Sequence, residues 1–254
     1  MTAVYELAGV HKHFRKGQTE LVALRDVNLS VAAGSFLVLL GRSGCGKSTL
    51  LNLLAGLASI TSGEVRHQGR PVTGPQEGVG YLTQQDTLMP WRTVARNVEM
   101  PQEIKGVPRQ SRAAAAQELI NRVGLAGFEH HYPRELSGGM RRRASLARML
   151  CGNPQTLLLD EPFGALDAEL RNELQQQLLN LWDGTGRTVV FVTHDIEEAL
   201  VLADRVVVLG PLGKIVLDAQ ISLSRPRNID EIRLQPGYLE QYAQLVKAIR
   251  GASA

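Results

Sequence analysis

A glycine-rich segment between an apolar run and a helical pattern has the residues needed to bind phosphate. It consists of Gly41, Arg42, Ser43, Gly44, Cys45, Gly46, Lys47, Ser48 and Thr49. These residues fit the pattern G-x-x-x-x-G-K-[ST], in which glycines let successive backbone N–H groups curl around phosphate oxygens at a helix N-terminus. In this pattern Lys47 reaches the β- and γ-phosphates, and the Ser48 hydroxyl holds Mg²⁺. The segment therefore predicts a nucleotide site.

Two adjacent carboxylates end a second apolar run and could supply the reaction chemistry. The run 156–159 leads directly into Asp160 and Glu161. Because neighbouring side chains of a strand point to opposite sides, the two acids can take different roles. Asp160 is the candidate Mg²⁺ ligand, directly or through water, and Glu161 is the candidate general base for an attacking water. An acidic strand end alone is often solvated surface, but the phosphate-binding segment favours the catalytic interpretation.

Cys45 lies among the amides of the phosphate-binding segment, directly before the predicted helix. A helix N-terminus lowers the pKa of a thiol. The sequence therefore predicts a reactive Cys45 whose alkylation blocks ATP binding and which bound ATP protects. The alternative, an inert small residue that fills the loop, stays open.

Short apolar runs and helical patterns alternate along most of the chain. We expect strands over 27–31, 36–40, 64–67, 79–83, 156–160 and 188–193, and a hairpin from 205–209 and 214–218. Helices are expected over 47–57, 168–182, from 195 to about 203, and over 239–249. This alternation predicts an α/β fold. From about 90 to 152 the strand patterns stop, and two helical patterns at 111–123 and 138–150 predict an all-helical insertion.

Composition narrows the class of protein further. The 254 residues, 44% of them hydrophobic, suit one large α/β domain or two small ones. Two cysteines fit a reducing compartment, no secretory signal is evident, and no apolar run reaches the ~18–20 residues that span a bilayer. Of the 28 basic residues 22 are arginine, but they are scattered among acids, which predicts no nucleic-acid partner.

One further segment, Leu136-Ser137-Gly138-Gly139-Met140-Arg141, resembles the signature motif of the ABC-transporter ATPase family. Other residues occupy positions where that family carries its remaining motifs: Phe14, Gln84, Asp160-Glu161, Phe163 to Asp167, and His194. The resemblance covers essentially the whole chain, 1–254, as a single ABC ATPase domain. It implies a P-loop NTPase fold with an ABC-type RecA-like core, an antiparallel β subdomain and an inserted α-helical subdomain at about 90–152.

The resemblance also implies a role for each matched residue, with ATP and Mg²⁺ bound. Phe14 is expected to stack on adenine, and Gln84 to contact both Mg²⁺ and the reaction centre. His194 is expected to sense the γ-phosphate and to hold Glu161 and the water in line. The N-cap hydroxyl and first amides of the signature helix, from Ser137, Gly138 and Gly139, together with Asp167, are expected to contact nucleotide held by a second copy in a head-to-tail dimer.

Two positions depart from the family pattern. Arg142 stands where glutamine is common, and Thr83 stands where an aromatic residue is usual. Because Arg142 follows the signature in its helix, we expect no loss of hydrolysis and an effect, if any, on packing against the partner. The effect of Thr83 on adenosine or partner contacts is left open.

The segment from Thr87 to Val98 resembles the nitrate, sulfonate and taurine group of bacterial importers. In that group a membrane subunit docks beside this segment, where Met89 and Trp91 could be apolar anchors; core packing is the alternative. The group implies transmembrane permease subunits, a periplasmic solute-binding protein, and a peripheral location at the cytoplasmic face of the inner membrane.

The transported substrate is expected to be a small anion, with taurine or another sulfonate first and nitrate, cyanate or a thiamine precursor as alternatives. A soluble ABC ATPase without a transport role is less favoured, because such members resemble tandem domains or carry long coiled coils. A small-molecule kinase is disfavoured by the signature segment.

Overall fold

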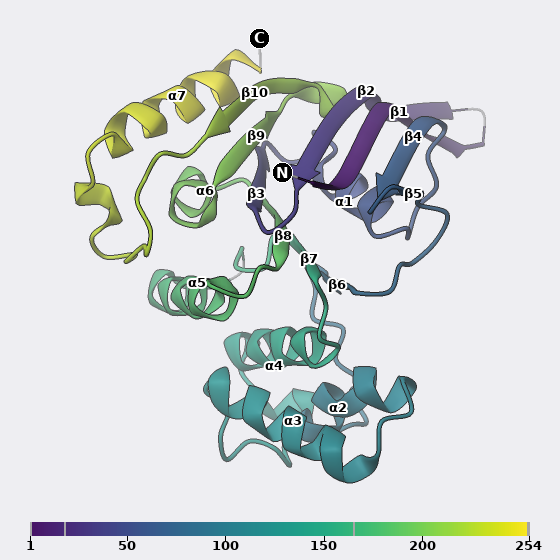
Figure 1. Ribbon diagram of the computed structural model, residues 1–254, viewed down its shortest axis with the longest axis vertical. Coiled ribbons are helices and arrows are strands. Elements are labelled where there is room, and N and C mark those ends of the chain that lie inside the picture. The colour runs from purple at the N-terminus through teal and green to yellow at the C-terminus, as the bar shows by residue number, and fades with distance from the viewer. Residues whose placement is uncertain (1, 18, 165, 253–254) are drawn as a thin grey trace.

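The computed structural model describes residues 2–17, 19–164 and 166–252, which fold into two β-sheets and a helical lobe (Figure 1). The smaller sheet has the strand order β2-β1-β4-β5, and the larger has the order β10-β9-β3-β8-β7-β6. Helices α2, α3 and α4 lie together below the sheets in Figure 1. The phosphate-binding segment 41–49 and the signature segment 136–141 therefore lie in different regions of the molecule.

The smaller sheet is antiparallel and contains a strand that the sequence patterns missed. Its strands are β1 (Ala3–Lys16), β2 (Thr19–Ala32), β4 (Ser62–His67) and β5 (Arg70–Pro71). The predicted strand 27–31 is only the end of β2. The sequence pattern did not predict β1, because a bulge interrupts its pairing between Leu7 and Val10. Its apolar residues therefore do not keep the two-residue period of a strand.

The larger sheet brings the candidate site residues to one edge. β3 (Phe36–Gly41), β6 (Val79–Leu82), β7 (Thr156–Asp160), β8 (Thr188–Thr193) and β9 (Arg205–Leu209) pair in parallel order, and β10 (Ile215–Gln220) closes the antiparallel hairpin predicted after β9. Every residue of β3, β7 and β8 is buried. Because parallel strands end at the same edge, the segments that follow them meet there.

Helices cover both faces of the larger sheet. On one face, α1 (Lys47–Leu54) lies between it and the smaller sheet, where the Tyr5 hydroxyl donates to the Leu54 carbonyl at 3.0 Å. On the other face lie α5 (Ala168–Trp182), α6 (Ile196–Leu202) and α7 (Tyr238–Gly251). The rings of Phe36 and Trp182 meet edge to face there, 5.4 Å apart. The helices expected in these regions are confirmed, with ends shifted by a few residues.

Residues 83–155, all described, contain no strand and form α2 (Val94–Ile104), α3 (Arg109–Arg122) and α4 (Gly138–Cys151) around a separate apolar core. The sequence analysis predicted α3 and α4 but missed α2, because Pro101 lies inside that helix. The Thr93 side chain caps its start by accepting from the Arg96 amide. Short 3₁₀ turns complete the fold at Pro133–Glu135, Pro211–Gly213 and Ile232–Leu234.

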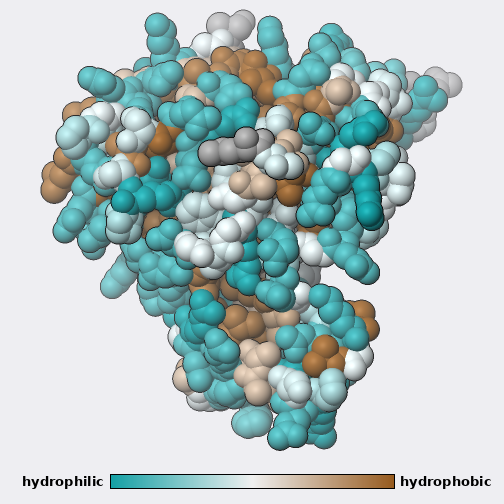
Figure 2. Space-filling model, in the orientation of Figure 1, coloured by the Kyte–Doolittle hydropathy of each residue, from teal (hydrophilic) through white to brown (hydrophobic). Residues whose placement is uncertain are grey.

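On the face shown in Figure 2, hydrophilic side chains cover most of the surface, and apolar ones gather in small patches. Among the described residues, no helix has the length and apolar character needed to cross a bilayer.

Candidate nucleotide site

The phosphate-binding segment follows β3 and leads into α1, in the strand–loop–helix order that the sequence predicted. Gly46 has φ +106°, and a Cβ on it would lie 2.6 Å from the Leu24 side chain. A Cβ on Gly41 would lie 2.5 Å from the Leu209 carbonyl oxygen. Only glycine fits at these two positions without displacing neighbours, so the sequence pattern has a steric cause here.

Lys47 is buried, with 4% of its surface exposed, and its amine points back along the loop. Nζ donates to the carbonyl oxygens of Gly41 at 2.8 Å and Arg42 at 3.0 Å, and it lies 3.7 Å from Glu161 Oε1. A buried ammonium at the mouth of a helix N-terminus favours an anionic ligand.

Ser48 and Asp160 lie together although 112 residues separate them in the sequence. Ser48 Oγ donates to Asp160 Oδ1 at 2.9 Å. Burial raises the pKa of Asp160, and the Ser48 hydrogen bond opposes that shift. A hydroxyl and a carboxylate are hard oxygen ligands, so this pair suits the predicted Mg²⁺.

Glu161 joins three of the predicted residues. Its Oε2 lies 3.3 Å from His194 Nδ1 and 3.5 Å from Gln84 Nε2, while its Oε1 faces Lys47. Glu161 also has φ +40°, an unfavourable conformation for a residue with a Cβ. Gln84, Glu161 and His194 follow the ends of β6, β7 and β8, so these three parallel strands place the three side chains together.

A groove over the loop collects most of the predicted nucleotide contacts. Its lining comprises Phe14, Leu21, Val22, Ala23, Ser43, Gly44, Gly46, Lys47, Ser48, Thr49, Gln84 and Glu161. Phe14 is 43% exposed at this groove, as an aromatic surface for a base requires. Arg42 and Cys45 are not among these residues and instead line a neighbouring hollow with Leu209 and Ile249.

The signature segment is not part of that groove in this chain. Ser137 caps α4, its Oγ accepting from the Met140 amide at 3.2 Å, and Gly139 packs where a Cβ would meet Leu170 at 2.2 Å. Gly138 lines a second hollow with Gln84, Glu161 and other residues. Ser137, Gly138 and Gly139 thus do not line the groove over the phosphate-binding loop of the same chain.

Asp167 caps α5, since its Oδ1 accepts from the Leu170 amide at 2.9 Å. Its neighbour Ala165, within the D-loop-like segment, lies outside the described residues. The structure gives Asp167 a local capping role; a contact with nucleotide remains a prediction.

The prediction of a lowered pKa for the Cys45 thiol is wrong for this structure. Cys45 is only 7% exposed and belongs to the apolar core between the sheets. Desolvation raises its pKa and outweighs the lowering by Lys47 and by backbone amides. Position at a helix N-terminus did not reveal that the side chain is buried, where desolvation outweighs the effect of the amides.

We therefore expect Cys45 to label slowly at pH 7, because its raised pKa keeps the thiol protonated and the thiolate is the reactive form. Maleimide labelling of the Cys151→Ala variant, followed by mass spectrometry from pH 7 to 10, measures this. The rate should rise throughout the range. A plateau below pH 8, with a rate matching free glutathione, would contradict the buried thiol. The converse variant, Cys45→Ala, reports Cys151, whose pKa burial raises to about 11.

Arg142 is also not where the sequence analysis expected it. It was assigned to packing against a partner, yet it is 6% exposed and makes contacts within its own chain. Its Nε donates to the Pro162 carbonyl at 2.6 Å, and its Nη1 donates to the Thr83 carbonyl at 2.6 Å. The two departures from the family pattern are thus in direct contact. α4 directs the Arg142 side chain inward, a direction that sequence position did not reveal.

A buried network behind His194 was missed by the sequence analysis. Glu198 accepts hydrogen bonds from the hydroxyl of Thr193 and from Gln175 Nε2, and burial raises its pKa. Thr193 Oγ1 in turn accepts from the Asp195 amide at 3.0 Å. These contacts fix the backbone on both sides of His194. The only signal in the sequence was Glu198 itself, near the start of the helix expected from 195 to about 203.

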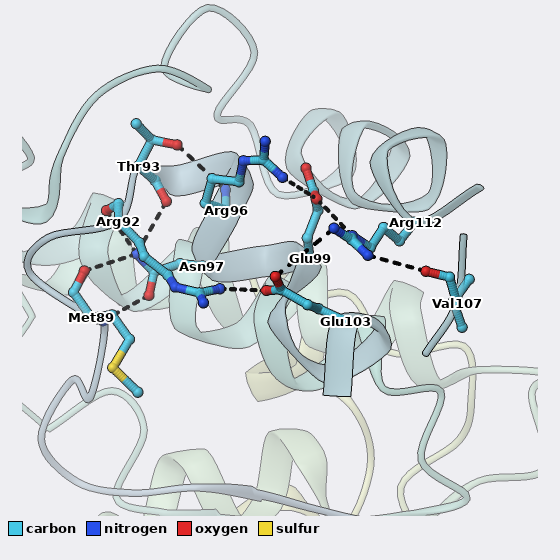
Figure 3. A network of polar contacts seen from close by, with 9 residues as sticks. All are labelled: Met89, Arg92, Thr93, Arg96, Asn97, Glu99, Glu103, Val107 and Arg112. Carbon is cyan, nitrogen blue, oxygen red and sulfur yellow. Dashed lines mark hydrogen bonds and ion pairs between the residues drawn. The ribbon is translucent and has the colours of Figure 1, made fainter. Parts of the chain in front are cut away.

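The segment before α2 is held by a polar network (Figure 3). Asn97 is fully buried; its Nδ2 donates to the carbonyls of Met89, Arg92 and Thr93, and its Oδ1 accepts from the Met89 amide. Ion pairs of Arg92 with Glu103, and of Arg96 and Arg112 with Glu99, brace the helix itself. Trp91, between these anchored residues, is 72% exposed. Core packing, one of its two open interpretations, is therefore excluded.

Comparisons with known proteins agree with this geometry. The sequence profile of the family described as "ABC transporter" matches residues 24–164. The taurine import ATP-binding protein TauB of Yersinia pestis bv. Antiqua is 49% identical over 189 residues, 74% of each chain. The nitrate import ATP-binding protein NrtC of Synechococcus elongatus is 43% identical over 246 residues, which are 95% of this chain and 37% of NrtC.

A solved dimeric structure of the ATP-binding cassette MJ0796, bound to ADP and Pi, superposes with a TM-score of 0.78. It is 33% identical in sequence, and the match covers 85% of this chain and 98% of the MJ0796 chain.

Proposed function

The chain belongs to the ABC transporter family as an ATP-hydrolysing subunit, and from this premise we propose that it powers the import of a small sulfonate, with taurine as the first candidate. The observation that supports ATP hydrolysis, which would power this import, is that Lys47, Gln84 and His194 all contact Glu161 beside the phosphate-binding loop. The 49% identity to a taurine import ATP-binding protein supports the substrate class.

In the proposed mechanism, the loop amides and Lys47 bind the phosphates, and Phe14 stacks on the base. Ser48, Asp160 and Gln84 would hold Mg²⁺, which would neutralise charge on the phosphate oxygens. Glu161 takes a proton from the attacking water through its carboxylate. His194 contacts the same carboxylate, so it orients Glu161 toward that water.

We further propose that two copies are needed to complete each site. Within one chain, Ser137, Gly138 and Gly139 lie outside the groove that the phosphate-binding loop lines. A capped helix N-terminus with free amides binds anions, so a second copy placed head to tail can offer it to the γ-phosphate. The dimeric state of the MJ0796 cassette supports this arrangement.

Permease subunits are proposed to dock on the segment before α2. A periplasmic solute-binding protein would deliver the substrate to these permease subunits. This docking would place the chain peripherally at the cytoplasmic face of the inner membrane. Trp91 is the proposed anchor, because it is exposed while the buried Asn97 holds its flanking backbone in place. A rigid aromatic side chain loses little conformational entropy on binding.

We expect Trp91→Ala to lower recovery of a co-expressed permease by about tenfold or more, the loss typical of a binding hot spot. ATP hydrolysis by the isolated subunit should stay within about twofold of wild type, because an exposed side chain contributes little to folding. Co-purification from membranes and a phosphate-release assay measure the two quantities. Leu239→Ala, which removes another exposed apolar side chain at 76% exposure on α7, is the matched control. Unchanged recovery of the permease would contradict the docking role.

Uptake of labelled substrate in intact cells tests the substrate class. Disruption of the gene should abolish taurine uptake and leave nitrate uptake intact, and the wild-type gene should restore it while the Glu161→Gln gene does not. The 43% identity to NrtC favours nitrate as the second candidate. Loss of nitrate uptake alone would establish that alternative.

A further inference from the structure

One buried arginine connects the segments that carry Gln84 and Glu161. Arg142 projects from the second turn of α4, and its guanidinium lies between two backbone carbonyls. Thr83, which accepts from Nη1, directly precedes Gln84. Pro162, which accepts from Nε, directly follows Glu161. Both hydrogen bonds are 2.6 Å long, and both are charge-assisted because the donor is a guanidinium cation.

The two hydrogen bonds of Arg142 are important because its side chain is a buried cation. Burial lowers the pKa of the Arg142 guanidinium to about 10, while Asp86 and Asp160 oppose that shift, so the group stays cationic at neutral pH. Within the described part of the chain, Nη2 is buried without an acceptor. The carbonyls of Thr83 and Pro162 therefore provide the direct compensation for burying this cation, and moving either segment away leaves the charge uncompensated.

No other arginine of α4 makes this connection. Arg141 contacts Asp86 and the Leu136 carbonyl, and Arg143 contacts Glu173 and the Val123 carbonyl. Arg148 contacts the carbonyl and hydroxyl of Thr87. The planar guanidinium carries five donors in a fixed fork, so one arginine can bond two carbonyls that point from different directions. A lysine has a single nitrogen, and the glutamine common in the family has a shorter, uncharged amide.

We propose that Arg142 is a positioning residue that holds the Gln84 and Glu161 segments in register and so ties hydrolysis to the placement of helix α4. This inference rests on the proposed roles of Gln84 and Glu161, and it is independent of the transported substrate. It replaces the expectation that Arg142 leaves hydrolysis unaffected. Because α4 begins at the signature segment, any movement of that helix is passed through Arg142 to both segments.

The test compares Arg142→Met, Arg142→Lys and Arg142→Gln with the neighbour control Arg143→Met. For Arg142→Met we expect kcat to fall by about 10- to 100-fold, the loss that small misplacement of reacting groups causes. The Kd for ATP should change by less than about threefold, because Lys47 and Ser48 are untouched. Arg142→Lys should recover part of kcat through one carbonyl. Arg143→Met should keep both values within about twofold of wild type.

Glu161→Gln and the double variant Arg142→Met/Glu161→Gln complete a double-mutant cycle with Arg142→Met and the wild type. If Arg142 acts through Glu161, the double variant should hydrolyse ATP at about the Glu161→Gln rate, since the contributions are not additive. If the losses of kcat in the two single variants multiply in the double variant, the inference about Arg142 is wrong. The same holds if Arg142→Met has a normal kcat while Glu161→Gln is inactive, and in both cases the proposed role of Glu161 stands. Normal hydrolysis by Glu161→Gln overturns the proposed base. If Arg142→Met does not fold, Arg142→Gln carries the same expectations, with thermal melting as the check on folding.

Discussion

Replacing Glu161 by glutamine is expected to lower kcat by about 10²–10⁴-fold, the contribution of a general base, while ATP binding persists. Glutamine keeps the size of the side chain and a hydrogen-bonding partner for His194, but its amide cannot take a proton from water. The change removes the negative charge and basicity of the carboxylate whose Oε2 lies 3.3 Å from His194 Nδ1 and 3.5 Å from Gln84 Nε2. Phosphate release at saturating Mg-ATP measures kcat, and a fluorescent ATP analogue measures binding.

The Glu161→Gln variant should also accumulate as an ATP-bound dimer, because binding persists while hydrolysis does not. Size-exclusion chromatography with and without Mg-ATP detects this species. Glu240→Gln, which neutralises an exposed carboxylate on α7, is the control and should behave as wild type. Hydrolysis at the wild-type rate would remove Glu161 from the role of base, whatever the state of the dimer.

Replacing Lys47 by alanine is expected to weaken ATP binding itself, by about 10- to 100-fold, because each charge-assisted hydrogen bond contributes about 1.5–3 kcal/mol. The Lys47 amine is buried and already directed at the loop by its bonds to the Gly41 and Arg42 carbonyls. No other lysine lines the groove among the described residues. Isothermal titration calorimetry with Mg-ATP gives the affinity.

The two largest effects therefore fall on different quantities, kcat for Glu161 and Kd for Lys47. Lys247→Ala removes an exposed lysine from α7 and should leave the Kd unchanged. Thermal melting of Lys47→Ala without nucleotide tests whether loss of the contact with Glu161, 3.7 Å away, affects folding. A Kd within about threefold of wild type would contradict the assignment of Lys47 to phosphate binding.

The arginine excess has a structural basis that composition did not reveal. From the sequence, the scattered arginines indicated only that no nucleic-acid partner is expected, yet several of these side chains donate to backbone carbonyls of distant segments. Arg205 donates to the Ser30 carbonyl and pairs with Asp218, and Arg148 reaches the Thr87 carbonyl. Arg227, buried, donates to the carbonyls at the end of α6. Donors spread over one planar group let a single arginine bond acceptors that lie apart, whereas the donors of a lysine all sit on one nitrogen.

The local sequence determined the phosphate-binding loop, the two carboxylates and the helix and strand types that flank them. In each case the chemistry depends on residues adjacent in the chain: glycines for a loop that admits no Cβ, a capped helix start, and an apolar run ending in acids. Strand β1 and helix α2 were missed because bulges and Pro101 disturb the period on which such predictions rest.

Only the tertiary structure decided which way side chains point and what they meet. The sequence suggested an activated thiol at Cys45 and, at Arg142, an effect on packing against a partner, but both side chains are buried within the chain. Burial then raises the pKa of the Cys45 thiol and makes Arg142 dependent on the carbonyls of Thr83 and Pro162. The parallel sheet likewise brings Gln84, Glu161 and His194 together, because its strands end at one edge. Desolvation and long-range contacts depend on the whole fold, so no local pattern encodes them.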